Sequence, residues 1–186
     1  NSTNVHIGPI SIGMHFNPYG ESLVSNKNKI RLEMADSDPR HDQLFSLTWT
    51  LAIFIQSINK ESKFFTFNSI YGHHGILNKD NTKRPLYHLN NFLISLTNSE
   101  IFKFNPVNEV YGLKIVLNHK NYFLFVNSSK QKKEIIIPEI NFSNQYKLNL
   151  KNYTDIFNND FSFFNFKKDL NPYAFEPLEI KFIEDK

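Results

Sequence analysis

The sequence predicts an α/β segment followed by an all-β segment, and three observations lead to this fold class. Before about Thr97, apolar residues recur at helical spacing, and short β-prone runs precede these stretches. Strand followed by helix is the repeating unit of an α/β protein. After Thr97 the apolar residues alternate with polar ones, which is typical of antiparallel strands with one face toward solvent. The expected domains are therefore residues 1–98 and residues 99–186.

The first β/α unit begins with an alternating run at residues 10–16, which predicts a strand, because Pro9 limits pairing before it. A polar loop follows. Asp38 can then cap free amides, and Pro39 suits the first position of a helix. With apolar residues at helical spacing after these two, a largely buried helix is predicted over residues 38–58.

The second unit begins with an aromatic run at residues 64–70, which predicts a strand covered on both faces, as parallel strands under helices are. Residues 71–75 are expected to form a loop. Thr82 and Pro85 then open a second helix, whose apolar face continues to Thr97.

The all-β half contains short segments of period two, at a spacing that suggests an antiparallel β-sandwich. Residues 118–121 and 127–131 are expected to be hairpin turns, and the alternation in residues 145–150 and 178–183 predicts one solvated face for each of those strands. The candidate strands are residues 101–104, 110–117, 122–126, 134–137, 145–150, 161–166 and 178–183.

Composition excludes several functional classes. The formal net charge is +3, but lysines are interleaved with acidic residues, so no nucleic-acid partner is expected. The sequence contains no cysteine, which excludes disulfides, thiolate metal sites and a cysteine nucleophile. No apolar run approaches the length of a membrane span, so we expect a cytoplasmic protein without a membrane partner.

Two β/α units cannot close a barrel, which takes eight such units and about 250 residues. Two units by themselves would also leave open sheet edges. We therefore expect this chain to be the later part of a longer protein, or to meet a complementing chain that supplies the remaining strands.

A family resemblance fits this expectation. Residues 38–51 (DPRHDQLFSLTWTL), 67–75 (FNSIYGHHG) and 84–88 (RPLYH) resemble the end of the barrel in D-apionate lactonase-like proteins. That family is similar to barrel glycoside hydrolases with a C-terminal β-sandwich, which residues 110–113, 123–127 and 175–180 resemble. The resemblance implies the last two units of a (β/α)8 barrel followed by a sandwich, and a hydrolase acting on a small sugar or sugar lactone.

In barrel enzymes the working residues lie where strands end and the following loops begin. His15 and Asn17 at the first strand end could bind a polyhydroxylated ligand or simply cap the strand. Asn68 at the second strand end is a substrate-binding candidate. Tyr71, in the loop that follows, could stack on a sugar ring or pack.

His73 and His74 are weak catalytic candidates, because imidazole titrates near neutrality, but each could also be an ordinary loop histidine. Adjacent residues of an extended loop point opposite ways, so the two histidines are not expected to bind one metal. Arg40 and His41, at the predicted helix start, are expected to hold the loop in place. No phosphate loop, serine nucleophile elbow or His-Glu metal motif occurs, so no cofactor or metal is expected.

Neither strand end carries a carboxyl group, although glycoside hydrolysis needs two. Asn68 and Ser69 occupy the position where the resemblance places Glu. Glu21 and Glu33 lie in the polar loop that follows the first predicted strand. The main acid and base are therefore expected from upstream strands. The leading hypothesis is the C-terminal segment of a carbohydrate- or sugar-lactone-acting hydrolase, which contributes substrate-positioning loops. The alternative is a non-catalytic glycan-binding or structural interaction module.

Overall fold

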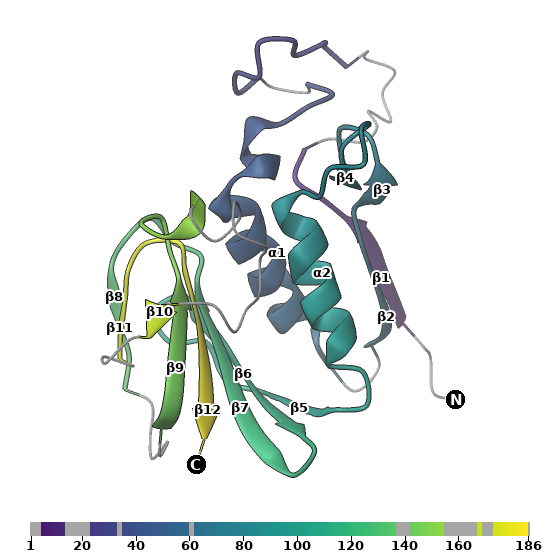
Figure 1. Cartoon of the computed structure of the whole chain (residues 1–186). Helices are drawn as coiled ribbons and strands as arrows, with labels where there is room; N and C mark the ends of the chain where they lie inside the picture. Colours follow the sequence, from purple (N-terminus) through teal and green to yellow (C-terminus); the bar gives the residue numbers. More distant parts are fainter. Residues whose placement is uncertain are drawn as a thin grey trace.

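The computed structural model describes residues 5–13, 23–32, 35–59, 62–136, 142–154, 167–168 and 173–185. Its elements lie in three layers (Figure 1). A parallel strand pair forms one side, two helices lie in the middle, and a six-stranded sheet forms the other side.

The parallel pair consists of β1 (Val5–Ile10) and β2 (Ser62–Phe67). The parallel pairing agrees with an α/β segment, but the prediction of a first strand at residues 10–16 was wrong, because residues 11–13 are not in a strand. The strand instead runs through Pro9: the register with β2 shifts between Ile7 and Ile10, so an irregularity accommodates the residue that lacks an N–H.

Only one face of β2 is covered by a helix. The rings of Phe65 and Phe67 pack against Phe54 of the first helix at centroid distances of 5.1 and 6.0 Å. Phe64 points the other way and remains 64% exposed, and His6 of β1 lies beside it on the same face. The prediction of a strand covered on both faces is therefore wrong for the described residues.

The predicted helix over residues 38–58 is divided into two elements. Asp38 accepts a hydrogen bond from the backbone of Arg40 and caps the 3-10 helix η1 (Pro39–Asp42), in agreement with the predicted cap. Gln43 has an extended conformation, and α1 (Leu44–Ser57) begins after it. The start of the helical region thus forms a separate turn in front of α1.

The segment between β2 and the second helix contains two short strands, β3 (Ser69–Tyr71) and β4 (Gly75–Leu77). Asn68 separates β2 from β3 because its φ of 58° interrupts the extended backbone, so the single strand predicted for residues 64–70 is broken there. The second helix, α2 (Pro85–Ser95), begins at Pro85 as predicted. None of the described helices combines the length and hydropathy needed to cross a membrane.

The second half of the chain forms an antiparallel sheet with the order β10-β9-β12-β7-β6-β5. A separate two-stranded pair joins β8 (Lys133–Glu134) to β11 (Ala174–Phe175). The members of the larger sheet are β5 (Glu100–Lys103), β6 (Val110–Leu117), β7 (Lys120–Asn127), β9 (Phe142–Leu148), β10 (Lys167–Lys168) and β12 (Glu179–Asp185).

The turn after β6 is a hairpin turn, as predicted, because β6 and β7 pair on both sides of it. The second predicted hairpin, at residues 127–131, is wrong. Strand β7 pairs with β12 and β6, whereas β8 pairs with β11. The final strand thus enters the sheet between β7 and β9, and the candidate strand at residues 161–166 lies outside the described residues.

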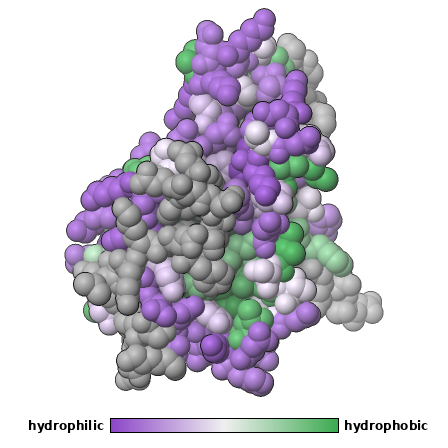
Figure 2. All heavy atoms as spheres, viewed as in Figure 1, coloured by the Kyte–Doolittle hydropathy of each residue, from purple (hydrophilic) through white to green (hydrophobic). Residues whose placement is uncertain are grey.

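The larger hydrophobic core lies between the helices and the six-stranded sheet. It takes side chains from both halves of the chain. Around it, Figure 2 shows a mainly hydrophilic surface, with hydrophobic residues gathered near the end of α2 and over β6 and β7. The buried members are Leu44, Leu47, Leu51, Ala52, Ile55, Leu86, Leu89, Phe92, Leu96, Leu113, Ile115, Leu124, Val126, Leu148, Ile180 and Phe182.

The opposite face of the sheet is also covered. A smaller cluster there includes Phe125 of β7, Phe175 of β11 and Ile135 after β8. As a result Glu179 and Lys181 of β12 are buried, and the predicted solvated face of residues 178–183 was wrong. Polar residues at alternate positions predict a solvent-facing side, but Glu179 and Lys181 pair with each other inside the protein.

Candidate functional site

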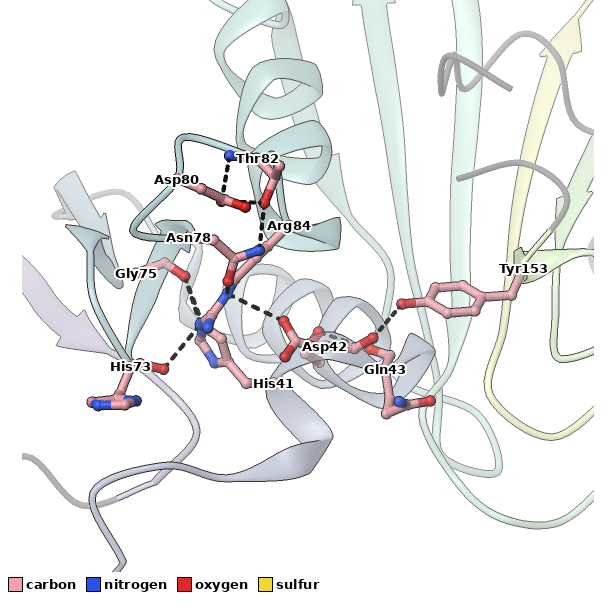
Figure 3. A network of polar contacts seen from close by, with 11 residues as sticks. His41, Asp42, Gln43, His73, Gly75, Asn78, Asp80, Thr82, Arg84 and Tyr153 are labelled. Atoms are coloured by element: carbon pink, nitrogen blue, oxygen red, sulfur yellow. Dashed lines mark hydrogen bonds and ion pairs between the residues drawn. The ribbon is translucent and has the colours of Figure 1, made fainter. Parts of the chain in front are cut away.

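The candidate site lies at the carboxyl ends of β1 and β2. It is built mainly by residues 68–84, which connect β2 to α2 and which we call the site segment. Helix η1 lies beside the segment (Figure 3). Four of the predicted site residues lie in it: Asn68, Tyr71, His73 and His74.

Asn68 follows β2 directly and has an unusual environment. Its backbone N–H donates to the carbonyl of Ile10, 3.0 Å away, and so joins the ends of the two parallel strands. Asparagine tolerates the left-handed conformation better than most residues. The side chain is only 7% exposed, yet neither Nδ2 nor Oδ1 has a hydrogen-bond partner among the described residues. A buried amide without partners costs free energy, so this group requires an explanation.

Tyr71 and the two histidines differ in burial. Tyr71 is exposed, and so is His73, whose Nε2 lies 4.0 Å from Oδ2 of Asp36. His74 is half-buried, and its ring lies over Gly13, where an added Cβ would approach Cε1 to 3.1 Å. The two rings therefore have different neighbours. Within the described ranges, no group of three metal-ligating side chains occurs.

His15 and Asn17, the candidates at the end of the first predicted strand, lie outside the described residues. The site as described is therefore formed by the site segment and the start of the helical region.

Arg84 connects the site segment to the helical region (Figure 3). Its Nη1 donates to the carbonyls of His73 and Gly75 at 3.0 and 3.2 Å. Its Nε donates to Oδ1 of Asn78 at 2.8 Å and lies 3.2 Å from Oδ1 of Asp42 in η1. The side chain is only 12% exposed, so these charge-assisted contacts form largely out of water.

His41 provides a second connection. Its Nε2 donates to the Gly75 carbonyl at 3.0 Å, which agrees with the expected role in holding the loop. The ring is buried, and desolvation lowers the pKa of His41, opposed by the hydrogen bond to Gly75. Since Nε2 carries the proton, Nδ1 of the neutral ring is an acceptor, and it has no partner in the described part of the chain.

The nearby carboxylates are engaged in local contacts. Asp38 forms a 2.6 Å ion pair with Arg40, and this hydrogen bond holds the pKa of Asp38 below its ordinary value. Asp80 accepts a hydrogen bond from the hydroxyl of Thr82 at 2.7 Å. The carboxylate of Asp42 is held by the arginine described above. Asp42 and Asp80 thus organise the site segment, whereas Asp38 organises η1.

Sequence reasoning located the segment but missed Arg84 as its central side chain. In the sequence, Arg84 stands out only as part of the motif at residues 84–88 that resembles the lactonase family. Two of its partners are backbone carbonyls, and the spacing of residues in the sequence does not predict such contacts. The Arg-Pro step at a helix start was the one available signal.

Parallel strands packed against a helix, with a polar segment at their carboxyl ends, are typical of the β/α barrel class of proteins. The family described as the TIM barrel domain of D-apionate lactonase matches residues 1–98. The chain belongs to this family.

One related protein sequence and two solved structures are similar to this chain. D-apionate lactonase of Brucella anthropi is 28% identical over 131 residues, which cover 67% of this chain and 22% of that protein. The chain thus spans about a fifth of the relative's length. A GH30 endoxylanase from Clostridium papyrosolvens has a TM-score of 0.50 at 10% identity, covering 81% of this chain and 39% of its own. A conserved exported protein from Bacteroides fragilis has a TM-score of 0.51 at 6% identity, with coverages of 87% and 37%. The similarity to these two solved structures concerns the fold alone.

Proposed function

We propose that this chain is the closing part of a hydrolase that acts on a carbohydrate or a sugar lactone. In this proposal β1, α1, β2 and α2 are the last two units of a (β/α)8 barrel. The six-stranded sheet and the β8–β11 pair are the two layers of the sandwich that follows. The ends of β1 and β2 line one side of the substrate pocket. Membership of the lactonase barrel family supports the reaction class.

The uncovered face of the strand pair supports a place in a larger barrel. Phe64, Thr66 and His6 lie on the face away from α1, and His6 Nε2 is 2.7 Å from the Thr66 hydroxyl. In a barrel, such a face meets the side chains of the other strands. The remaining strands of the longer protein, or a complementing chain, would then cover Phe64.

The single observation that carries a binding role is the amide of Asn68, which has no hydrogen-bond partner in the part of the chain that the structure describes. A primary amide offers two donors and one acceptor, which suits a hydroxyl group that both gives and takes a hydrogen bond. A sugar or sugar lactone presents several such groups. We therefore assign Asn68 to substrate positioning, with Tyr71 and His73 beside it on the same segment.

The test is a calorimetric titration of the intact protein with a panel of sugar acids and lactones, together with a hydrolysis assay. The key variant is Asn68→Gly, which removes the amide but tolerates the left-handed backbone. Asn98→Gly is a matched control, because Asn98 is an exposed asparagine with a φ of 69°. We expect at least tenfold weaker binding for the first variant and unchanged binding for the second. No binding across the panel would refute the proposed substrate class.

A non-catalytic binding module is the second candidate, and one observation favours it. The carboxylates of Asp38, Asp42 and Asp80 are all in local contacts, and the end of β2 carries an amide. Glycoside hydrolysis needs two available carboxyl groups. Binding that depends on Asn68 without turnover of any bound compound would select this candidate.

A further inference from the structure

Arg84 joins two separate parts of the chain, the site segment and η1. Its guanidinium contacts two backbone carbonyls and one side-chain amide of the site segment, and it pairs with Asp42 of η1. Tyr153, which follows β9, donates its hydroxyl hydrogen to the Asp42 carbonyl at 2.8 Å (Figure 3). Arg84 therefore joins the site segment to η1, and the all-β half contacts η1 through the backbone of Asp42.

Two other contacts hold the site segment: the Asn68 N–H donates to the Ile10 carbonyl, and Ile76 packs against the larger core. Ser69, Ile70 and Tyr71 of β3 are exposed. Within the segment, the Gly75 N–H donates to the Gly72 carbonyl at 3.0 Å, and the Ser69 N–H donates to the His74 carbonyl at 3.2 Å. These bonds shape the turn but do not attach it to the neighbouring helices. Among the described residues, the polar contacts that tie this turn to η1 and to the start of α2 are made by Arg84 and by His41.

We infer that Arg84 is the positioning residue of the site segment, and that it sets where Tyr71, His73 and His74 are presented at the strand ends. The role of those side chains rests on the proposed function, but the positioning itself does not. Arginine suits this task because its planar guanidinium carries five N–H donors in a rigid arrangement. A lysine ammonium is a point charge and cannot span two carbonyls, an amide and a carboxylate in the same way.

The first test measures the segment without reference to activity. In the intact protein, hydrogen exchange of the amides in residues 69–78 is compared among wild type, Arg84→Lys, Arg84→Gln and Arg40→Gln. Arg40 is the matched control, because it pairs with Asp38 at the same helix start and, within the described part of the chain, its side-chain hydrogen bonds go to Asp38 and not to the site segment. We expect exchange at least tenfold faster in both Arg84 variants and unchanged exchange in the control. Unchanged exchange in Arg84→Gln would overturn the inference.

A double-variant comparison guards against general unfolding. Asp42→Asn and Arg84→Gln remove the two partners of one ion pair, so their effects on exchange in residues 69–78 should not add. The exchange of β6 and β7 amides serves as an internal reference for global stability. Additive effects, or equal acceleration in β6 and β7, would overturn a local positioning role.

The second test uses the substrate or ligand found for the proposed function. If Arg84 positions groups that contact the substrate, Arg84→Lys should lower kcat/KM or binding at least tenfold. The change in Tm caused by Arg84→Lys should be smaller than the change caused by Arg40→Gln. A purely structural role would lower Tm and leave kcat and KM of the folded fraction unchanged, and this result would overturn the inference. Fast exchange in the Arg84 variants together with silence across the sugar panel would refute the proposed function alone.

Discussion

Lys181 and Glu179 form an ion pair inside the protein. The Nζ of Lys181 lies 3.6 Å from Oε1 of Glu179, and their side chains are 0% and 1% exposed. Asn149 donates to Oε2 of the carboxylate at 2.7 Å, and the ammonium lies 4.8 Å from the ring centre of Phe175. Burial raises the pKa of Glu179, while Asn149 and Lys181 oppose this shift. The two charges thus depend on each other.

Removing one member of this pair should be strongly destabilising. Lys181→Met leaves a buried carboxylate without its counter-charge, and we expect a loss of about 3–5 kcal/mol in the free energy of unfolding. Adding Glu179→Gln should recover most of the loss. Because the pKa of Glu179 is raised on folding, its contribution is fully present below the unfolded pKa and is lost as the pH rises, so the deficit of Lys181→Met should be larger at pH 8 than at pH 5. Urea unfolding at both pH values measures this, and an unaffected Lys181→Met variant would contradict it.

The shared core predicts a large effect of a single truncation. Leu51 is fully buried between the helix and the sheet, so Leu51→Ala should cost about 2–5 kcal/mol. Ile94 lies on α2 but is 67% exposed, so Ile94→Ala should change stability by less than about 0.5 kcal/mol. Denaturant titration compares the two variants. Similar costs for both would mean that the helices do not pack on the sheet in solution.

The burial of His41 predicts a pH dependence of stability. Desolvation lowers its pKa on folding, so the unfolded state binds the proton more readily than the folded state. Stability should therefore decrease as the pH falls below the ordinary histidine value of 6.5. His41→Gln removes this titration, and its free energy of unfolding should change less between pH 7 and pH 5 than that of the wild type. An identical slope in the two proteins would show that His41 does not titrate as described.

Gly112 and Gly72 should resist substitution for different reasons. A Cβ at Gly112 would lie 2.4 Å from Cε1 of the Phe125 ring, so Gly112→Ala should cost about 1–3 kcal/mol through overpacking. Adding Phe125→Leu should relieve part of this cost. At Gly72 nothing lies within 4 Å, but φ is +94°, so Gly72→Ala should cost about 1 kcal/mol through backbone strain. Thermal unfolding of the three variants tests this; no relief by Phe125→Leu would argue against the ring contact.

The sequence predicts secondary structure correctly where the spacing of hydrophobic residues alone shows which positions are buried. The strand at residues 110–117 has the predicted bounds, and α2 begins at the predicted proline. Prediction failed where partners are distant in sequence. Strand β12 lies between β7 and β9, so no local turn in the sequence predicts its pairing. Its two charged residues are typical of a solvated face, and only the neighbouring strands show that they are buried.

The same distinction applies to the candidate site. The order of elements alone predicts that Asn68 follows a strand, and the structure confirms this position, whereas its role in binding stays a prediction. The contacts of Arg84 depend on where the carbonyls of His73 and Gly75 point, and only the folded backbone fixes those directions.

The continuity of the larger core constrains how such a protein can evolve. Leucines of α1 and α2 interlock with Leu113 and Leu124 of the sheet, although the matched barrel family ends at residue 98. Recombination that joined this α/β half to an unrelated β half would leave cavities or steric clashes in the core between the helices and the sheet. We expect the two halves to be inherited together, with compensating substitutions in the core that they share.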